Sequence, residues 1–446
     1  MVKILHLSDI HMGGGFSHGR INPETGLNTR LEDFTLALRR CVDGAIAQQV
    51  DLVLFGGDAF PDATPPPYIQ QAFAGEFTRL VEANIPTVLL VGNHDQHSQG
   101  AGGASLCIYR TLGVPGFIVG DTLTTHRIET KSGPVQVVTL PWLTRSTLLT
   151  RPETQGLSMG EVGELLLDRL RVVLEGEIRK LDKEIPTVLL AHLMTDTARY
   201  GAEKFLAVGK GFTVPMAILA RDCFDYIALG HVHKYQEVCQ SPLAIYPGSI
   251  ERVDFSEEKE EKGYILLDLE KGKAAAEFCK LPARVFKTLE VDLTKHGDAN
   301  QAKAEPKGAQ GALVRAVAKE DITDKVIRLI YKLRADQVDD IDNGALNEAL
   351  STAHSYTIQP QLVSQLSRPR LPELGVDSSL SPMSALEAYL DNREDLGALA
   401  PDILEAAQGL LNKDPHGDKK IVAPDVDALD TGDALSDDDT RQLRLL

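Results

Sequence analysis

The fold is best inferred from Val91-Gly92-Asn93-His94-Asp95, which directly follows the apolar run Pro86 to Leu90 and leads into a polar, glycine-rich segment. A short apolar run that ends in turn residues is typical of a buried strand. Here the strand ends in Asn, His and Asp, which are side chains that can bind a metal ion. The stretch therefore indicates a strand that carries ligands at its carboxyl end.

Four further apolar runs end in the same way. They are Ile4 to Leu7 before Ser8-Asp9-Ile10-His11, Leu52 to Phe55 before Gly56-Gly57-Asp58, Val188 to Ala191 before His192, and Tyr226 to Leu229 before Gly230-His231-Val232-His233. Helical spacing of apolar residues over 27–49 and 159–181 predicts helices between some of these strands. Parallel strands linked by helices place their carboxyl ends at one edge of a sheet, where ligands bind. We therefore expect an α/β fold in which the five strand ends converge.

Spacing within two of the runs supports this expectation. Asp9 and His11 are two residues apart, and so are His231 and His233. In extended backbone, side chains two residues apart point to the same face. Each pair is therefore predicted to serve one site.

The candidate ligands comprise carboxylates, an amide and imidazoles. They are Asp9, His11, Asp58, Asn93, His192, His231 and His233. Oxygen and nitrogen ligands without thiolate suit manganese, iron or zinc and argue against calcium. Seven ligands suit two ions about 3.5 to 4 Å apart that share a carboxylate, for which we choose Asp58. Such a pair of ions stabilises the attacking and the leaving oxygen of a displacement at phosphorus.

His94 is interpreted differently, because it adjoins Asn93 and should project away from it in extended backbone. We predict that it acts as a general acid near the leaving group. A single histidine at a strand end is more often structural than a ligand. Five of the twelve histidines, however, stand at the ends of apolar runs, so the joint pattern favours a metal site.

In this order, the five segments resemble the signature of the calcineurin-like metallophosphoesterases. The stretch Tyr246-Pro247-Gly248-Ser249-Ile250-Glu251-Arg252, followed by an acidic run and Lys262-Gly263-Tyr264, is similar to the SbcD-type nuclease subunits of SbcCD DNA-repair complexes. The resemblance extends to about residue 290 and is looser afterwards. It implies a sandwich of two central sheets flanked by helices.

The resemblance also implies roles for individual residues. One manganese ion would be held by Asp9, His11, Asp58 and His233, and the other by Asp58, Asn93, His192 and His231, although Mg²⁺ or another divalent ion could replace them. His94 matches the catalytic histidine of the family. The chain departs from the family at Pro61 and Asp62, where many members carry His or Asp, which puts a supporting role at that position in doubt. Substrate-binding residues are not indicated.

The predicted domains follow composition and resemblance. They are a nuclease domain over 1–282, a small α+β cap domain over 283–365 that by resemblance binds DNA, a linker over 366–382, a helical segment over 383–411 and an acidic, disordered tail over 412–446. The apolar face of the helical segment either binds a partner, by resemblance an SbcC-type ATPase subunit, or packs back on its own domain. Residues 257–262 are expected to form a charged hairpin tip and 294–310 a flexible loop.

The formal net charge of −18 argues against strong nucleic-acid binding, since phosphate contacts normally need a basic surface. Residues 421–446, with seven Asp and two Arg, contribute −5 of it. A metal site supplies its own positive charge and a partner subunit can supply a groove, so we expect weak DNA binding by this chain alone. Five cysteines without metal-finger spacing indicate a cytoplasmic compartment, and no apolar run approaches the ~18 residues of a membrane span.

By resemblance, we expect a metal-dependent nuclease of DNA repair and recombination. It would degrade double-stranded ends in the 3′-to-5′ direction and cut hairpins and single strands, as a homodimer within a heterotetramer that contains the ATPase. Two alternatives stay open: a phosphodiesterase of nucleotides or other small esters that uses the same site, and a binding subunit whose site is inactive.

Overall fold

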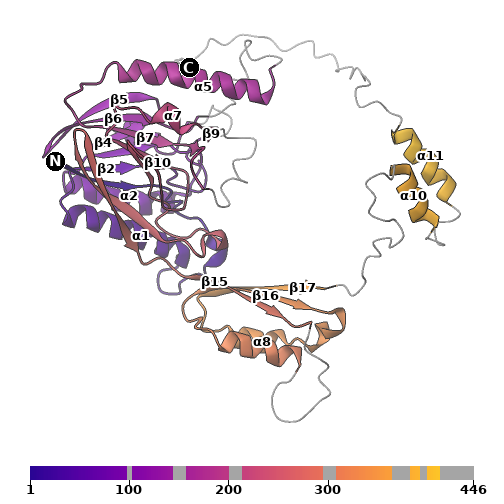
Figure 1. The fold of residues 1–446 in the computed structure, drawn as a ribbon. Helices are drawn as coiled ribbons and strands as arrows, with labels where there is room; N and C mark the ends of the chain where they lie inside the picture. Colours follow the sequence, from indigo (N-terminus) through magenta and orange to yellow (C-terminus); the bar gives the residue numbers. More distant parts are fainter. Residues whose placement is uncertain are drawn as a thin grey trace, which may run out of the picture.

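The structure is a computed structural model that describes residues 1–97, 103–143, 157–199, 213–294, 308–363, 382–391 and 399–411. Two six-stranded sheets dominate it (Figure 1). The first has the order β14 (Lys273–Leu281), β13 (Lys262–Glu270), β1 (Val2–Leu7), β2 (Leu52–Phe55), β3 (Thr87–Leu90), β4 (Phe117–Gly120). The second has the order β11 (Gln236–Gln240), β12 (Leu243–Tyr246), β10 (Tyr226–Gly230), β7 (Thr187–His192), β6 (Gly133–Leu140), β5 (Thr124–Thr130).

The strands that carry candidate ligands are parallel within each sheet. β1, β2, β3 and β4 run parallel, and β13 and β14 add an antiparallel edge. In the second sheet β6, β7, β10 and β12 run parallel, with β5 and β11 antiparallel at the edges. The five predicted strand ends therefore come from two sheets, three from the first and two from the second. This arrangement confirms the predicted α/β fold with two central sheets.

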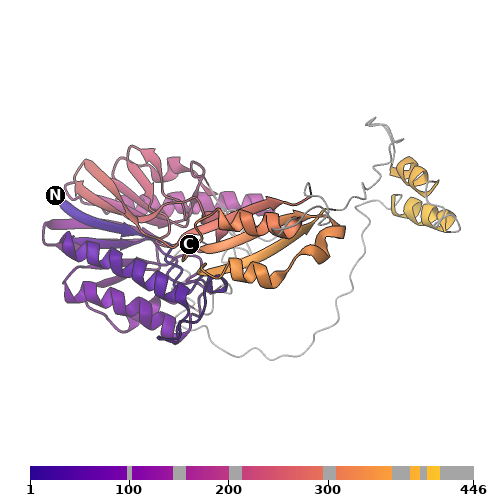
Figure 2. The same ribbon diagram turned by 90° about the horizontal axis from the view of Figure 1, so that it is seen from below.

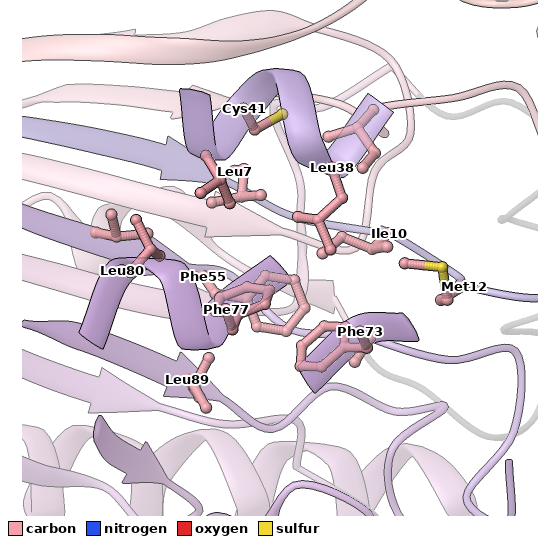
Figure 3. Packing of buried hydrophobic residues seen from close by; sticks show 14 of the residues in the cluster. Leu7, Ile10, Met12, Leu38, Cys41, Phe55, Phe73, Phe77, Leu80 and Leu89 are labelled. Atoms are coloured by element: carbon pink, nitrogen blue, oxygen red, sulfur yellow. The ribbon is translucent and has the colours of Figure 1, made fainter. Parts of the chain in front are cut away.

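Three apolar layers hold the sheets and helices together. The facing sides of the two sheets pack on each other through residues such as Ile4, Leu54, Val88, Leu190 and Ile245. Helices α1 (Thr29–Ala47) and α2 (Pro67–Glu82) cover the outer side of the first sheet, where Phe55, Phe73 and Phe77 are in contact (Figure 3). Helix α5 (Met159–Ile178) covers the outer side of the second sheet. The strands are thus buried on both faces, which explains their continuous apolar runs.

Local signals start the long helices where the sequence predicts them. The side chain of Asn28 accepts a hydrogen bond from the backbone N–H of Arg30 at the start of α1. Ser158 and Glu161 form a reciprocal capping box at the start of α5. The remaining short elements are η1 (Phe16–His18), α3 (Cys107–Thr111), β8 (Met194–Thr195), β9 (Thr213–Val214), α7 (Met216–Leu219), η3 (Phe255–Glu257) and η4 (Ala335–Asp340).

A third, three-stranded sheet lies beside the end of the two large sheets (Figure 2). Its strands β15 (Phe286–Asp292), β16 (Val326–Leu333) and β17 (Ser355–Leu362) are parallel. Helices α8 (Ala309–Ala318) and α9 (Asn343–Ala349) pack on one face through residues such as Leu313, Leu329 and Leu346. The opposite face exposes Glu290, Lys332, Thr357 and Gln359. The start of α8 was wrongly assigned to the loop over 294–310, and residues 295–307 of that loop lie outside the described residues.

Arg284 connects the three-stranded sheet to the large sheets. Its guanidinium donates hydrogen bonds to both carboxylate oxygens of Asp33 in α1, at 2.6 and 2.7 Å, and to Asp324 before β16, at 2.8 Å. His354, directly before β17, lies 2.8 Å from the hydroxyl of Thr29 at the start of α1. These contacts fix the small sheet next to the segment that follows β1.

Helices α10 (Pro382–Asp391) and α11 (Ala400–Leu411) occupy the predicted helical segment. The predicted linker, apart from its last residue, and the predicted acidic tail lie outside the described residues. The predicted domain boundaries and the partner of the helical segment stay predictions. Among the described helices, none has the length and hydropathy needed to cross a membrane.

Candidate metal centre

The loops after β1, β2 and β10 place their polar side chains through unusual backbone conformations. Asp9 (φ 53°), His11 (φ 46°), Asp58 (φ 58°) and His231 (φ 100°) all have positive φ. Non-glycine residues rarely adopt this conformation, and where they do it often marks a functional site. The argument from extended backbone was therefore wrong in its geometry, although Asp9 and His11 do share one site.

Two glycines make these loops possible. Gly57 has φ +97°, and a Cβ there would lie 2.6 Å from Nδ1 of His192. A Cβ on Gly92 would lie 2.1 Å from Oδ1 of Asp58. Since real Cβ atoms do not approach other atoms so closely, glycine at position 57 lets the loop after β2 reach His192 of the second sheet, and glycine at position 92 lets the loops after β2 and β3 meet.

The structure brings the seven predicted ligands into neighbouring groups. Among the described residues, three sets could each hold a metal ion: Asp9, His11 and His233; Asp58, His192 and His231; and His11, Asp58 and His94. Asp58 belongs to two sets, and Asn93 lies within hydrogen-bond distance of His192 and His231. His231 and His233 fall in different sets, contrary to the prediction from their spacing but as the family resemblance implies.

In the set around His192, the atoms that point inward are acceptors or can become acceptors. Nδ1 of His192 donates to the Gly56 carbonyl at 2.7 Å, so its Nε2 faces Oδ1 of Asn93 at 3.0 Å and Oδ2 of Asp58 at 3.3 Å. Oδ1 of Asn93 also lies 2.9 Å from Nδ1 of His231. Nε2 of His231 is buried and has no hydrogen-bond partner among the described residues. A cation between Nε2 of His192, Oδ2 of Asp58, Oδ1 of Asn93 and Nδ1 of His231 would satisfy these four atoms, whereas Nε2 lies on the far side of the His231 ring.

The set around His11 has the same character. Nδ1 of His233 lies 2.7 Å from Oε1 of Glu257, which can only accept when ionised, so Nε2 of His233 faces Nε2 of His11 at 3.0 Å. Asp9 completes the set and accepts hydrogen bonds from Ser8 Oγ at 2.5 Å and from the backbone N–H of His231 at 3.0 Å. Two facing imidazole nitrogens beside a carboxylate suit a divalent metal ion.

Burial and charge set the protonation of these groups in the metal-free protein. Burial lowers the pKa of His11 to about 3 and holds the pKa of His231 well below its usual range, so both imidazoles are neutral and can bind a metal. Burial alone would also lower the pKa of His192, but the charge of Asp58 outweighs it and raises this pKa to about 9. The His192 proton thus occupies a place that a metal ion would take.

His94 lies at the edge of the centre and is half-buried. Its backbone N–H donates to Oδ1 of Asp58 at 2.9 Å. Its Nδ1 donates to the carbonyl of Pro61 at 2.7 Å, so Nε2 is the ring nitrogen that this hydrogen bond does not use. Pro61, at which the chain departs from the family pattern, therefore orients His94 through its backbone carbonyl. A proline provides this carbonyl as well as any other residue.

The family model described as calcineurin-like phosphoesterase matches residues 2–235, which are 234 of the 446 residues. The chain belongs to the calcineurin-like phosphoesterase family. It is accordingly a metal-dependent hydrolase of phosphate esters, and the metal sets described above lie within or at the edge of the matched region.

Several solved structures are similar to this phosphoesterase. A protein of Thermus thermophilus, TT1561, is 19% identical, with 62% of this chain and 98% of that chain covered and a TM-score of 0.35. A dimetal phosphatase from Danio rerio is 13% identical, with 62% and 95% covered and a TM-score of 0.38. A purple acid phosphatase from yellow lupin seeds is 12% identical, with 63% and 51% covered and a TM-score of 0.35.

Asp95 has a different role from the one that its position at a strand end suggests. It is fully buried and accepts backbone N–H bonds from Gly92, Asp58 and Ala59, at 2.9 to 3.0 Å. It therefore holds the loops after β2 and β3 together instead of joining one of the three metal sets. Nothing in the sequence separates this supporting aspartate from a ligand.

Residues 257–262 were wrongly predicted to form a charged hairpin tip, since they lead from η3 into β13 and do not join two paired strands. Glu257 and Lys262 are 4% and 1% exposed and form an ion pair at 2.7 Å. Glu257 also accepts the hydrogen bond of His233. Among five charged neighbours, the sequence has no signal that singles out this carboxylate as buried.

Trp142 forms one wall of the phosphoesterase centre. Its ring lies 4.8 Å from that of His231, at 34° between the planes, and it is 7% exposed. A buried tryptophan against a candidate ligand limits the positions that His231 can adopt.

Proposed function

We propose that this phosphoesterase is a two-manganese DNA nuclease subunit of the SbcD type, active in DNA repair and recombination. It would degrade double-stranded DNA from its ends in the 3′-to-5′ direction and cut hairpins and single strands. The proposed hydrolysis is supported above all by the convergence of seven predicted ligands from two sheets, with His94 beside them.

Each ligand set has residues that hold it in place. When bound, two divalent ions supply the charge that activates the attacking water and offsets the charge of the phosphate. Asp58 keeps its position because Oδ1 accepts the backbone N–H of His94, and Asp9 because it accepts the backbone N–H of His231. His94, with Nδ1 committed to the Pro61 carbonyl, has Nε2 to donate a proton to the departing sugar oxygen.

Two features support DNA as the substrate. The stretch from Tyr246 to Tyr264, which carries the resemblance to SbcD-type subunits, contacts both a metal set through Glu257 and the three-stranded sheet through Glu258. The three-stranded sheet also leaves part of one face open and polar, beyond the part that Phe255 and Glu258 cover. A small ester would require neither feature.

The net charge of −18 indicates that DNA affinity depends on a partner. We propose that α10 and α11 bind an SbcC-type ATPase subunit, and that the protein works in the cytoplasm as a homodimer within a heterotetramer. An amphipathic helix pair such as α10 and α11 suits a partner groove.

The test is manganese-dependent release of nucleotides from linear duplex DNA by the purified chain, alone and with the ATPase subunit. His94→Ala serves as the inactive comparison, and bis(p-nitrophenyl) phosphate as a small ester. We expect the unaltered chain to cleave both substrates and His94→Ala to cleave neither. Cleavage of the small ester alone, even with the ATPase subunit present, would contradict the nuclease assignment and favour a phosphodiesterase of nucleotides or other small esters.

A further inference from the structure

The turn of residues 254–258 touches a metal set and the three-stranded sheet at the same time. Within it, Glu257 accepts a hydrogen bond from His233 at 2.7 Å. Its neighbour Glu258 accepts hydrogen bonds from the backbone N–H and the hydroxyl of Thr288 in β15, at 3.1 and 2.6 Å. We call these five residues the bridging turn.

Glu257 is held rigidly on the metal side. Its other oxygen pairs with Lys262 at 2.7 Å, and the Lys262 ammonium also donates to Ser249 at 2.8 Å. The side chains of Glu257 and Lys262 are 5% and 0% exposed. A carboxylate fixed in this way determines the tautomer and the ring orientation of His233, and hence where its Nε2 points.

Phe255 and Glu258 hold the turn on the sheet side. The ring of Phe255 lies 5.0 Å from that of Phe286, and both are buried with Val326 in a small apolar cluster. The guanidinium of Arg328 lies 4.4 Å above the Phe255 ring. Because Phe255 and Glu258 lie within two residues of Glu257, a shift of the sheet would act on the turn that carries the carboxylate that orients His233.

We propose that Glu257 is a positioning residue for His233. We also propose that the bridging turn couples the packing of the three-stranded sheet against this turn to metal binding by Asp9, His11 and His233. This inference rests on the proposed function, since it concerns the same centre. The coupling is reciprocal: the free energy by which a metal ion at this set stabilises the packed sheet equals the free energy by which the packed sheet strengthens metal binding. The set around His192 is oriented by Gly56 and Asn93 and is expected to respond little.

The first experiment is a calorimetric Mn²⁺ titration of the unaltered chain, Glu257→Gln/Lys262→Met and Lys262→Met. The double variant removes the carboxylate without leaving the lysine buried and unpaired, and Lys262→Met keeps the carboxylate on His233. In the double variant, one of two ions is expected to bind about 10- to 100-fold more weakly and the other as before. Lys262→Met, which removes the ion pair but leaves the carboxylate next to His233, is expected to weaken binding of the same ion less than the double variant does.

Equal binding of both ions by the double variant and the unaltered chain, or an equal loss at both sites, would overturn the positioning role. A titration in which the unaltered chain binds fewer than two ions would instead count against the proposed function. The two failures are therefore distinguishable.

The second experiment measures amide hydrogen exchange with and without Mn²⁺. Peptides from 286–292 are expected to exchange more slowly when Mn²⁺ is added to the unaltered chain, and this protection is expected to disappear in the double variant. Peptides from 159–178, in α5, serve as the reference. Unaltered exchange over 286–292 on addition of Mn²⁺ would overturn the coupling.

Discussion

The two large sheets and the three-stranded sheet are both built on parallel strands, but they are buried differently. Strands β1, β2, β3, β7 and β10 are covered on both faces, by the facing sheet and by helices. Among the described residues, helices pack on only one face of the three-stranded sheet, and its other face exposes Glu290, Lys332 and Gln359 beyond the part that Phe255 and Glu258 cover. Parallel sheets are usually covered on both faces, so the open part of this face is unusual.

The difference separates the part of the protein that performs chemistry from the part that we propose positions the substrate. In the large sheets, charged groups such as Asp9, Asp58 and His192 are buried, and the charge of each group affects the pKa of its neighbours. On the open face of the small sheet, side chains can change without disturbing a core. Substitutions in the first region should therefore affect catalysis strongly, and those on the open face should affect stability little.

Asp58→Asn is the strongest test of the claim that substitutions in the large sheets affect catalysis. Loss of the carboxylate shared by two metal sets is expected to lower turnover by about 10⁴-fold and to weaken binding of both ions. Steady-state hydrolysis of a small phosphodiester, together with metal analysis, measures both effects. Asp62→Asn, an exposed carboxylate a few residues away, is the matched control and should retain activity. Near-normal turnover by Asp58→Asn would contradict the shared role.

His94→Ala separates chemistry from metal binding within the same region. Because the backbone N–H of residue 94 still reaches Asp58, two ions should remain while turnover falls about 10³-fold. Partial recovery of turnover with added imidazole is expected. Loss of one ion in this variant would mean that His94 is a ligand.

Leu329→Ala in β16 sharpens the contrast with the small sheet. Leu329 is fully buried, so its truncation is expected to destabilise the three-stranded sheet by about 2–5 kcal/mol. Gln359→Ala, on the open face, should change the free energy of unfolding by less than about 0.5 kcal/mol. Chemical denaturation followed by hydrogen exchange over 326–333 measures both. Equal destabilisation by the two variants would show that the open face is covered in solution.

The dependence of metal binding on pH should distinguish the two metal sets. His192 is protonated below about pH 9 in the metal-free protein, because Asp58 raises its pKa, so an ion must displace this proton. The affinity of one ion should therefore fall about tenfold for each pH unit below 9. The stability that the His192–Asp58 pair gives the metal-free protein should be full below pH 6.5 and disappear as the pH rises through about 9. Calorimetry in two buffers of different ionisation enthalpy should detect the released proton, and affinities independent of pH would contradict this account.

The sequence was most informative where strands end. Apolar runs followed by Asp, Asn or His predicted the seven residues that the structure brings together, because buried parallel strands leave a clear pattern. Spacing did not predict how these residues are divided between the metal sets, since positive φ at Asp9, His11 and His231 breaks the alternation of an extended strand. Local conformation of that kind depends on glycines and hydrogen bonds contributed by other loops.

Supporting residues were the least predictable. Glu257 and Lys262 have the composition of an exposed run, and only the tertiary structure pairs them in the interior. The parallel pairing of β15, β16 and β17 was also hidden, because alternation of apolar residues indicates a covered face but not the direction of the neighbouring strand.

The central claim is that two ions are held by two sets of ligands that share Asp58. Anomalous diffraction at the manganese edge from crystals grown with Mn²⁺ tests it directly. We predict two peaks about 3.5 to 4 Å apart, one beside Asp9, His11 and His233 and the other beside Asn93, His192 and His231, with Asp58 between them. A single peak, or peaks away from these residues, would contradict the account.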